Sequence, residues 1–228
     1  MHIPDGYLSP QTYIPLYAAF VSTAIIAVKK VRKEVSSRLI PFIGMASAFS
    51  FIIMMFNIPV PGGSSGHATG AAVIAIILGP WAALIGISVA LVVQALVFGD
   101  GGITALGANC VNMAFIDPMV AYLIFYLSYK LFKNKTGLSA FLSGYISLSF
   151  TSLIAAIEYG IQPLIASAPD GKALYCPYSL KITIPAMTLE HLLLFGIIEG
   201  IITALIIKYF VKTEPGSVYF FNHRIPND

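Results

Sequence analysis

The chain has 228 residues, of which 57% are hydrophobic and 10% are charged, and its mean hydropathy is +0.85. Soluble domains carry about 25% charged residues, so the composition excludes an ordinary soluble enzyme, a secreted disulfide scaffold and a disordered chain. The net charge of +3 comes from 13 basic and 10 acidic residues. The basic residues cluster between apolar segments, which indicates membrane topology and no nucleic-acid partner. The two cysteines, Cys110 and Cys176, are too few for a disulfide framework.

Apolar segments of membrane-spanning length recur along the chain. They predict an all-α, multi-pass membrane protein with one membrane-embedded domain over residues 1–228. The third apolar run, 68–98, is longer than a hydrocarbon core of about 30 Å requires. Gly79 and Pro80 interrupt this run, and proline inside a helix removes a hydrogen bond and clashes with the preceding turn. The run is therefore either one kinked helix or two helices.

The charged residues decide between one helix and two. One basic cluster lies at residues 29–38 and another at residues 130–135, and short basic loops stay in the cytoplasm. An even number of crossings must separate them, and only a break at Gly79 and Pro80 gives four instead of three. We therefore expect seven membrane helices, with the N-terminus outside and the C-terminus cytoplasmic. The expected helices run over about 11–29, 39–58, 68–79, 80–98, 109–129, 138–162 and 182–210.

In this topology the N-terminus and residues 59–67, 99–108 and 163–181 share the outer face. The third helix, 68–79, has 12 residues and spans about 18 Å, which is too short to cross alone. The segment from Pro59 to His67 is therefore expected to dip into the membrane as an irregular loop. Such backbone is tolerated where it is buried in protein or lines a cavity, and transporters place binding sites beside broken helices.

The first residues contain Asp5 and no basic cluster, unlike a cleaved signal sequence, so we expect Met1 to remain in the protein. A histidine at position two can present three nitrogens to one metal ion: the terminal amine, its own deprotonated amide and the nearer imidazole nitrogen. His67, at the tip of the outer loop, is the candidate for a fourth nitrogen. A square of four nitrogens is typical of nickel(II) or copper(II). Alternatively, His2 is a frayed terminal residue and His67 lies beside a helix N-cap.

Four stretches of sequence resemble the NikM/CbiM family, the nickel- and cobalt-binding membrane subunits of energy-coupling-factor (ECF) transporters. They are residues 1–10, 65–72, 78–81 and 94–102, the last continuing through Asn109 to Asn112 and Met113. The resemblance covers essentially the whole chain, and the Met-His start with the Gly-His loop is its most specific part. It implies a six-helix substrate-binding core with an added first helix, and metal binding by Met1, His2 and His67 through four nitrogens. The Met-His-Ile-Pro-Asp-Gly start is closer to the nickel-type members.

The resemblance also implies partners and a location. Relatives dock on a transmembrane coupling (T) subunit driven by two ATP-binding-cassette ATPase subunits, and a small accessory membrane subunit is expected as a separate polypeptide. The protein would be the metal-capture subunit of an importer in the inner (plasma) membrane of a prokaryote. It would carry nickel(II) or cobalt(II) as its transported ion and hold no other cofactor.

An enzyme is not expected, because the chain has no P-loop, no zinc-type histidine spacing and no nucleophile elbow. Two rival hypotheses remain. One is a self-sufficient transition-metal channel or carrier, which would need no ATPase partner. The other is a membrane metalloenzyme, which would need an open coordination position and a general base beside it.

Other polar residues are weaker candidates. Five could hydrogen-bond the N-terminal segment or orient the metal ligands: Asp5, Ser65, Gln94, Asp100 and Asn109. Helix capping is the alternative role for those around the loop at 99–108. Ionisable residues inside apolar helices are expensive and indicate function by default: Asp117, Glu158, Glu190, His191 and Glu199. Glu190 and His191 could belong to an ion route or form an internal hydrogen-bonded pair.

Overall fold

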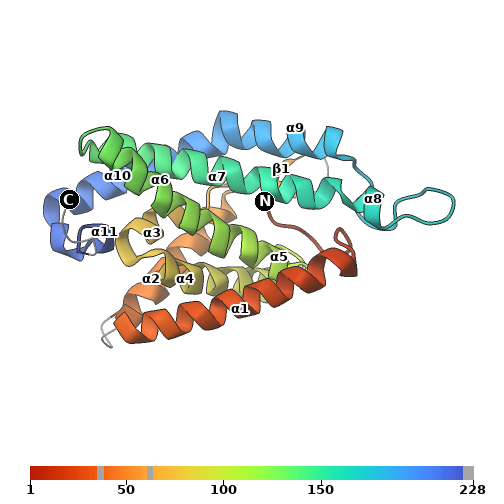
Figure 1. Ribbon diagram of the computed structural model, residues 1–228, viewed down its shortest axis with the longest axis horizontal. Helices are drawn as coiled ribbons and strands as arrows, with labels where there is room; N and C mark the ends of the chain where they lie inside the picture. Colours follow the sequence, from red (N-terminus) through yellow and green to blue (C-terminus); the bar gives the residue numbers. More distant parts are fainter. Residues whose placement is uncertain (35–38, 61–63, 223–228) are drawn as a thin grey trace.

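A computed structural model describes residues 1–34, 39–60 and 64–222. Within these residues the chain is a bundle of helices with one short two-stranded sheet (Figure 1). The expected helical, multi-pass architecture is confirmed, because five helical segments of the described chain are long and apolar enough to span a membrane. They are Pro10–Lys33, Pro80–Phe98, Leu106–Leu131, Thr136–Ile165 and Leu180–Thr213.

The elements follow in chain order. They are α1 (Pro10–Glu34), α2 (Leu39–Met55), β1 (Ile58–Val60), β2 (Ser64–Gly66), α3 (Ala71–Leu78), α4 (Pro80–Val93), η1 (Gln94–Phe98), α5 (Leu106–Asn109), η2 (Cys110–Ile116), α6 (Asp117–Leu131), α7 (Thr136–Gly160), α8 (Gln162–Ile165), α9 (Leu180–Glu190), η3 (His191–Phe195), α10 (Gly196–Thr213), η4 (Pro215–Ser217) and α11 (Tyr219–Asn222).

Two apolar helices are shorter than a full span. The apolar part of α2 runs over Ile40–Met55, and α3 has 8 residues. The number of seven crossings therefore stays a prediction. Several expected boundaries move: the first helix ends at residue 34 instead of 29 and the second at 55 instead of 58, while the third begins at 71 instead of 68 and the fifth at 106 instead of 109.

The predicted break at Gly79 and Pro80 is confirmed. Gly79 has φ 88°, a left-handed conformation that glycine adopts without steric cost, and Pro80 begins α4. The Gly79 N–H still donates to Ala75 O at 3.0 Å and closes α3. The start of α4 lies beside the end of α1, since Lys30 places its ammonium 4.2 Å from the centre of the Trp81 ring.

The strands β1 (58–60) and β2 (64–66) pair with each other, which corrects the expectation of irregular backbone at those residues. Ile58 pairs with Gly66 and Val60 with Ser64 in an antiparallel register. Strand pairing satisfies backbone N–H and C=O groups where water is scarce. The expected irregular loop also covered residues 61–63, which lie outside the described part of the chain.

Three of the long helices contain a π-helical segment, a feature often found at functional sites. The segment η1 begins at Gln94 and continues α4, while η2 joins α5 to α6. The third, η3, begins at His191 and joins α9 to α10. Sequence periodicity did not predict any of these segments.

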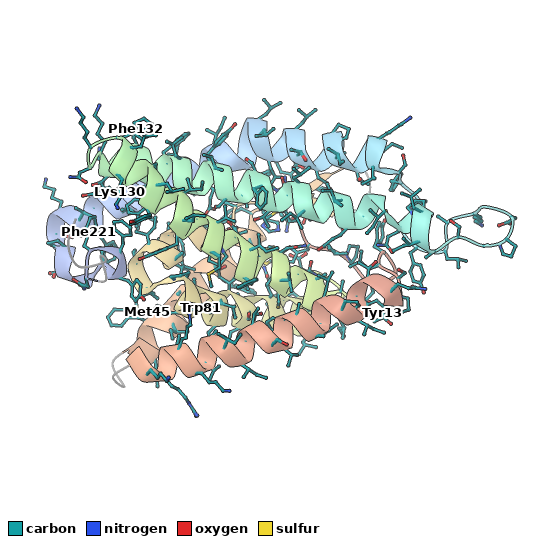
Figure 2. All side chains as sticks on the ribbon, in the orientation of Figure 1. Tyr13, Met45, Trp81, Lys130, Phe132 and Phe221 are labelled. Carbon is teal, nitrogen blue, oxygen red and sulfur yellow. The ribbon has the colours of Figure 1, made fainter. Side chains whose placement is uncertain are left out.

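The basic ends of the helices gather at one end of the bundle. Figure 1 shows the C-terminal end of α1, the connection from α6 to α7 and the end of α10 on the same side. Figure 2 labels Lys130 and Phe132 at that end and Tyr13 at the opposite one. The two basic clusters therefore share one end, as the parity argument requires. Which face of the membrane this end meets stays a prediction.

Candidate metal centre

The N-terminal segment does not fray but lies inside the bundle. Met1, His2 and Ile3 are 1%, 4% and 0% exposed. The Met1 side chain belongs to the largest apolar core, together with Met54 and Phe195. Chain termini are usually poorly ordered unless something holds them, so the hydrogen bonds that hold this one define the site.

Asn109 holds the segment through both ends of its side-chain amide. Its Oδ1 accepts from the N–H of Ile3 at 2.9 Å, and its Nδ2 donates to Ile3 O at 3.1 Å. The Gly102 N–H also donates to Ile3 O, at 2.8 Å, and the Tyr159 hydroxyl donates to His2 O at 3.1 Å. The backbone on both sides of His2 is thereby fixed.

Further contacts anchor the segment where it leaves the site. The Asp5 carboxylate accepts from the N–H groups of Ile103 and Thr104 at 3.1 and 2.7 Å and from the Thr104 hydroxyl at 2.5 Å. Gln162 Oε1 accepts from the Ser9 N–H at 2.9 Å. Asp5 was expected to anchor the segment, whereas Tyr159 and Gln162 were not expected to contribute. Only their position near the outer end of the segment 138–162 could have pointed to them.

Gln94 fixes the orientation of the His2 ring. The His2 Nε2 lies 3.2 Å from Gln94 Oε1, and a carboxamide oxygen only accepts hydrogen bonds. Nε2 therefore carries the ring proton, and Nδ1, the nitrogen nearer the backbone, keeps its lone pair. Nδ1 lies 3.6 Å from Asp100 Oδ1, which is too far for a direct hydrogen bond.

His67 lies beside His2 with the opposite tautomer. Their ring centroids are 4.6 Å apart with an interplanar angle of 34°. The His67 Nδ1 donates to Ala68 O at 3.1 Å, so Nε2 keeps its lone pair, and this buried nitrogen has no hydrogen-bond partner among the described residues. His67 follows β2 and is fully buried, so it does not lie at the tip of a loop.

The terminal amine completes the group. It donates to Ser65 O, so Ser65 contributes through its backbone. Its hydroxyl oxygen is buried without a hydrogen-bond partner in the described chain. The structure thus brings together Met1, His2 and His67, with Ser65, Gln94 and Asp100 around them.

Burial keeps these nitrogens neutral. It lowers the pKa of the Met1 amine from 8.0 to about 5, an effect that Glu190 and Asp100 partly oppose. Burial also lowers the pKa of His2 from 6.5 to about 3 and that of His67 well below 6.5. The pKa of Asp100 is raised because this carboxyl group is partly removed from water. At neutral pH the amine and both imidazoles are therefore uncharged, and each has one nitrogen with a lone pair.

The remaining sequence candidates make other described hydrogen bonds, although Glu190 and His191 lie close enough to the Met1 amine to interact with its charge. The His191 Nδ1 donates to Met187 O at 2.8 Å, so the described bond of His191 is not with Glu190. Glu158 accepts from Asn112 Nδ2 at 2.7 Å. Cys110 and Cys176 are both free thiols. No group of three or more His, Cys, Asp and Glu side chains that could hold a metal ion occurs in the described residues.

The fold and this buried cluster define a class: a multi-pass helical membrane protein with a nitrogen-rich site built around its own N-terminus. A family model described as "Cobalt uptake substrate-specific transmembrane region" matches residues 2–217. The chain belongs to this family, the CbiM family, and the family resemblance seen in the sequence is confirmed.

Individual relatives agree with the nickel-type resemblance. The fused nickel transport protein NikMN of Rhodobacter capsulatus is 44% identical over 218 residues, which cover 94% of this chain and 63% of that protein. This chain therefore spans less than two thirds of that relative. "Probable fused nickel transport protein LarMN" of Lactiplantibacillus plantarum is 43% identical over 221 residues, or 96% of this chain and 67% of that protein. A crystal structure of a transition metal transporter matches 100% of both chains, with a TM-score of 0.91 and 46% identity.

Proposed function

We propose that this protein is the high-affinity nickel(II)-binding membrane subunit of an ATP-driven ECF-type metal importer. The observation that carries the proposal is the arrangement of lone pairs. Gln94 accepts from Nε2 of His2 and Ala68 O accepts from Nδ1 of His67, so the other nitrogen of each ring carries no proton, and the two rings lie 4.6 Å apart beside a buried amine. A hydrogen-bond acceptor on the other ring nitrogen commonly orients a metal-binding histidine in this way.

The proposed ligands are four nitrogens: the Met1 amine, the deprotonated His2 amide, His2 Nδ1 and His67 Nε2. The first three belong to consecutive groups of one short chain and can close small chelate rings in a plane, and His67 supplies the fourth corner. Square-planar nitrogen coordination suits nickel(II). Cobalt(II) is the second candidate ion, because the family description names cobalt. The metal is the transported substrate, so no resident cofactor is proposed.

Four nitrogens in a closed plane leave no place for substrate chemistry, so we propose no enzymatic activity. The chain also has no P-loop of its own. The energy would come from two ATP-binding-cassette subunits acting through a transmembrane coupling (T) subunit, with a small accessory membrane subunit as a further partner. Relatives named as fused nickel transport proteins support a multi-part transporter. The proposed location is the inner membrane of a prokaryotic cell, with the N-terminal site on the outer face.

Uptake by vesicles tests this function against its rival. Vesicles that hold this chain alone should bind nickel(II) but accumulate none, whereas vesicles that also hold the coupling complex and ATP should accumulate it. Rapid ATP-independent flux through the isolated chain would instead establish a self-sufficient channel or carrier.

Site variants test the ligands. His2→Ala and His67→Ala should abolish tight nickel binding in the purified protein. His191→Ala is the matched control, because His191 is equally buried and its Nε2 also has no hydrogen-bond partner among the described residues. Loss of binding in the control alone would move the site to the last helical segment.

A further inference from the structure

Two carboxylates on other helices hold the segment that follows His67. Glu199 on α10 accepts hydrogen bonds from the N–H groups of Thr69 and Gly70, both at 3.0 Å. Asp117 at the start of α6 accepts from the Thr69 hydroxyl at 2.8 Å. Glu199 and Asp117 are 1% and 0% exposed. Glu199 therefore binds the backbone two and three residues after His67, and Asp117 binds the side chain of Thr69.

These contacts account for the first N–H groups of α3, which have no partner inside the helix. The N-cap residue Gly70 has no side chain with which to cap α3. Glu199 takes this role from a distant helix. The Thr69 hydroxyl accepts the remaining N–H, that of Ala71, at 3.2 Å. The N–H groups of Gly70 and Ala71 at the start of α3 are thus hydrogen-bonded by side chains.

Capping alone does not explain this arrangement. A serine or asparagine at the N-cap would satisfy the same groups locally, whereas carboxylates buried at membrane depth are costly. Oε1 of Glu199 and Oδ1 of Asp117 also lack hydrogen-bond partners among the described residues. Glu199 is 130 residues away from Thr69 in the sequence. The contact of Glu199 with the backbone of Thr69 and Gly70 fixes the position of the segment after His67 relative to α10.

The fixed segment determines where His67 points. The His67 ring bonds within the segment, to Ala68 O, so the ring follows any movement of this backbone. Ser50 on α2 donates to Thr69 O at 2.8 Å and holds the segment from a third side. We infer that Glu199, supported by Asp117, is a positioning residue that holds His67 Nε2 toward His2 and thereby raises the affinity for nickel(II). This inference rests on the proposed function.

A double-mutant cycle on the purified full chain tests it. Nickel(II) affinity is measured by calorimetry for the wild type, Glu199→Gln, His67→Ala and the double variant. Glu199→Gln keeps the size of the side chain and removes its charge, and it should weaken binding about 10- to 100-fold, as losses of ligand-orienting partners commonly do. In the His67→Ala background only weak binding by the nitrogens of Met1 and His2 remains, and the same change should alter this residual affinity by less than about twofold, because the segment then carries no ligand.

Glu158→Gln is the matched control. Glu158 is also a buried carboxylate, 8% exposed, but its side chain bonds Asn112, outside the segment, so this variant should bind nickel(II) like the wild type. An equal loss from Glu199→Gln in both backgrounds would mean a general effect on the fold and would overturn the inference. Unchanged affinity in the wild-type background would overturn it too. Failure of the proposed function looks different: the wild type would not bind nickel(II), or His67→Ala would bind it normally.

A milder variant keeps the test decisive if Glu199→Gln does not fold. Thr69→Val nearly preserves the shape of the side chain but removes the hydroxyl that bonds Asp117 and Ala71. Loss of such a hydrogen bond should weaken nickel binding about three- to tenfold in the wild-type background, with no loss in the His67→Ala background. Equal effects in the two backgrounds would again contradict a positioning role.

Discussion

Nickel(II) binding should release one proton between pH 8 and pH 6, the proton of the His2 amide. The pKa of the buried amine is lowered to about 5 and that of His2 to about 3, and the pKa of His67 is also well below 6.5. Groups with pKa values lowered this far carry no proton in that range. They therefore neither release protons when the metal binds nor let protons compete with it.

The magnitude follows from linkage. Release of one proton weakens binding tenfold per unit fall in pH, or about 100-fold from pH 8 to pH 6. An exposed terminus with ordinary pKa values would add competition of about 50-fold at the amine and about 15-fold at the two imidazoles, giving a total near 10⁵-fold. The buried site and a frayed terminus thus differ by almost three orders of magnitude. Binding should weaken more steeply only below about pH 5, where the amine takes up its proton.

Calorimetry in pairs of buffers with different protonation enthalpies counts the released protons directly. One proton per nickel ion at pH 7 is the expected result. Release of more than two would mean that the amine is protonated and the terminus is not buried before metal arrives. A flat affinity from pH 8 to pH 6, with no proton released, would exclude the amide as a ligand and favour carboxylates such as Asp100, Glu158 and Glu190.

Two further predictions address packing and topology. Gly102→Ala should weaken nickel binding, measured by calorimetry, about tenfold or more. A Cβ at Gly102 would collide with the Asp5 backbone, and such overpacking costs about 1–3 kcal/mol. Gly44→Ala is the control, because a Cβ there meets nothing within 4 Å and the affinity should not change. Equal affinities would show that the N-terminal segment tolerates displacement. A cysteine at Lys172 should react with an impermeant thiol reagent on intact cells, while one at Lys133 should react only after the cells are opened; labelling of both from outside would refute the topology.

Local chemistry made part of the structure predictable. The break at Gly79 and Pro80 follows from the stereochemistry of those two residues and from the parity of the basic clusters. The meeting of His2 and His67 was expected because the predicted topology puts both on one face and because the family resemblance implies that both bind metal. Asn109 and Gln94 were found for the same reason, since they lie beside the loop at 99–108.

Other parts depend on contacts between distant segments. Tyr159 reaches the backbone of His2 across 157 residues, and Glu199 reaches Thr69 across 130. Neither contact leaves a periodic pattern in one sequence, and a buried glutamate indicates function without naming its partner. The strands at 58–60 and 64–66 are too short, and Pro59 is too unusual in a strand, for a strand prediction. The π-helical segments at 94–98 and 191–195 depend on packing around the site.

The most direct test of the N-terminal chelate is nickel(II) affinity, measured by calorimetry, of the purified protein with one extra residue before Met1. The extension removes the amine from its chelate ring and should abolish tight binding, while the thermal stability of the metal-free protein changes little because the helices are untouched. Absorption supplies the matching signature, since the unextended protein should give the yellow colour of planar, low-spin nickel(II) and the extended one should not. Tight binding and an unchanged spectrum after the extension would contradict coordination by the terminal amine.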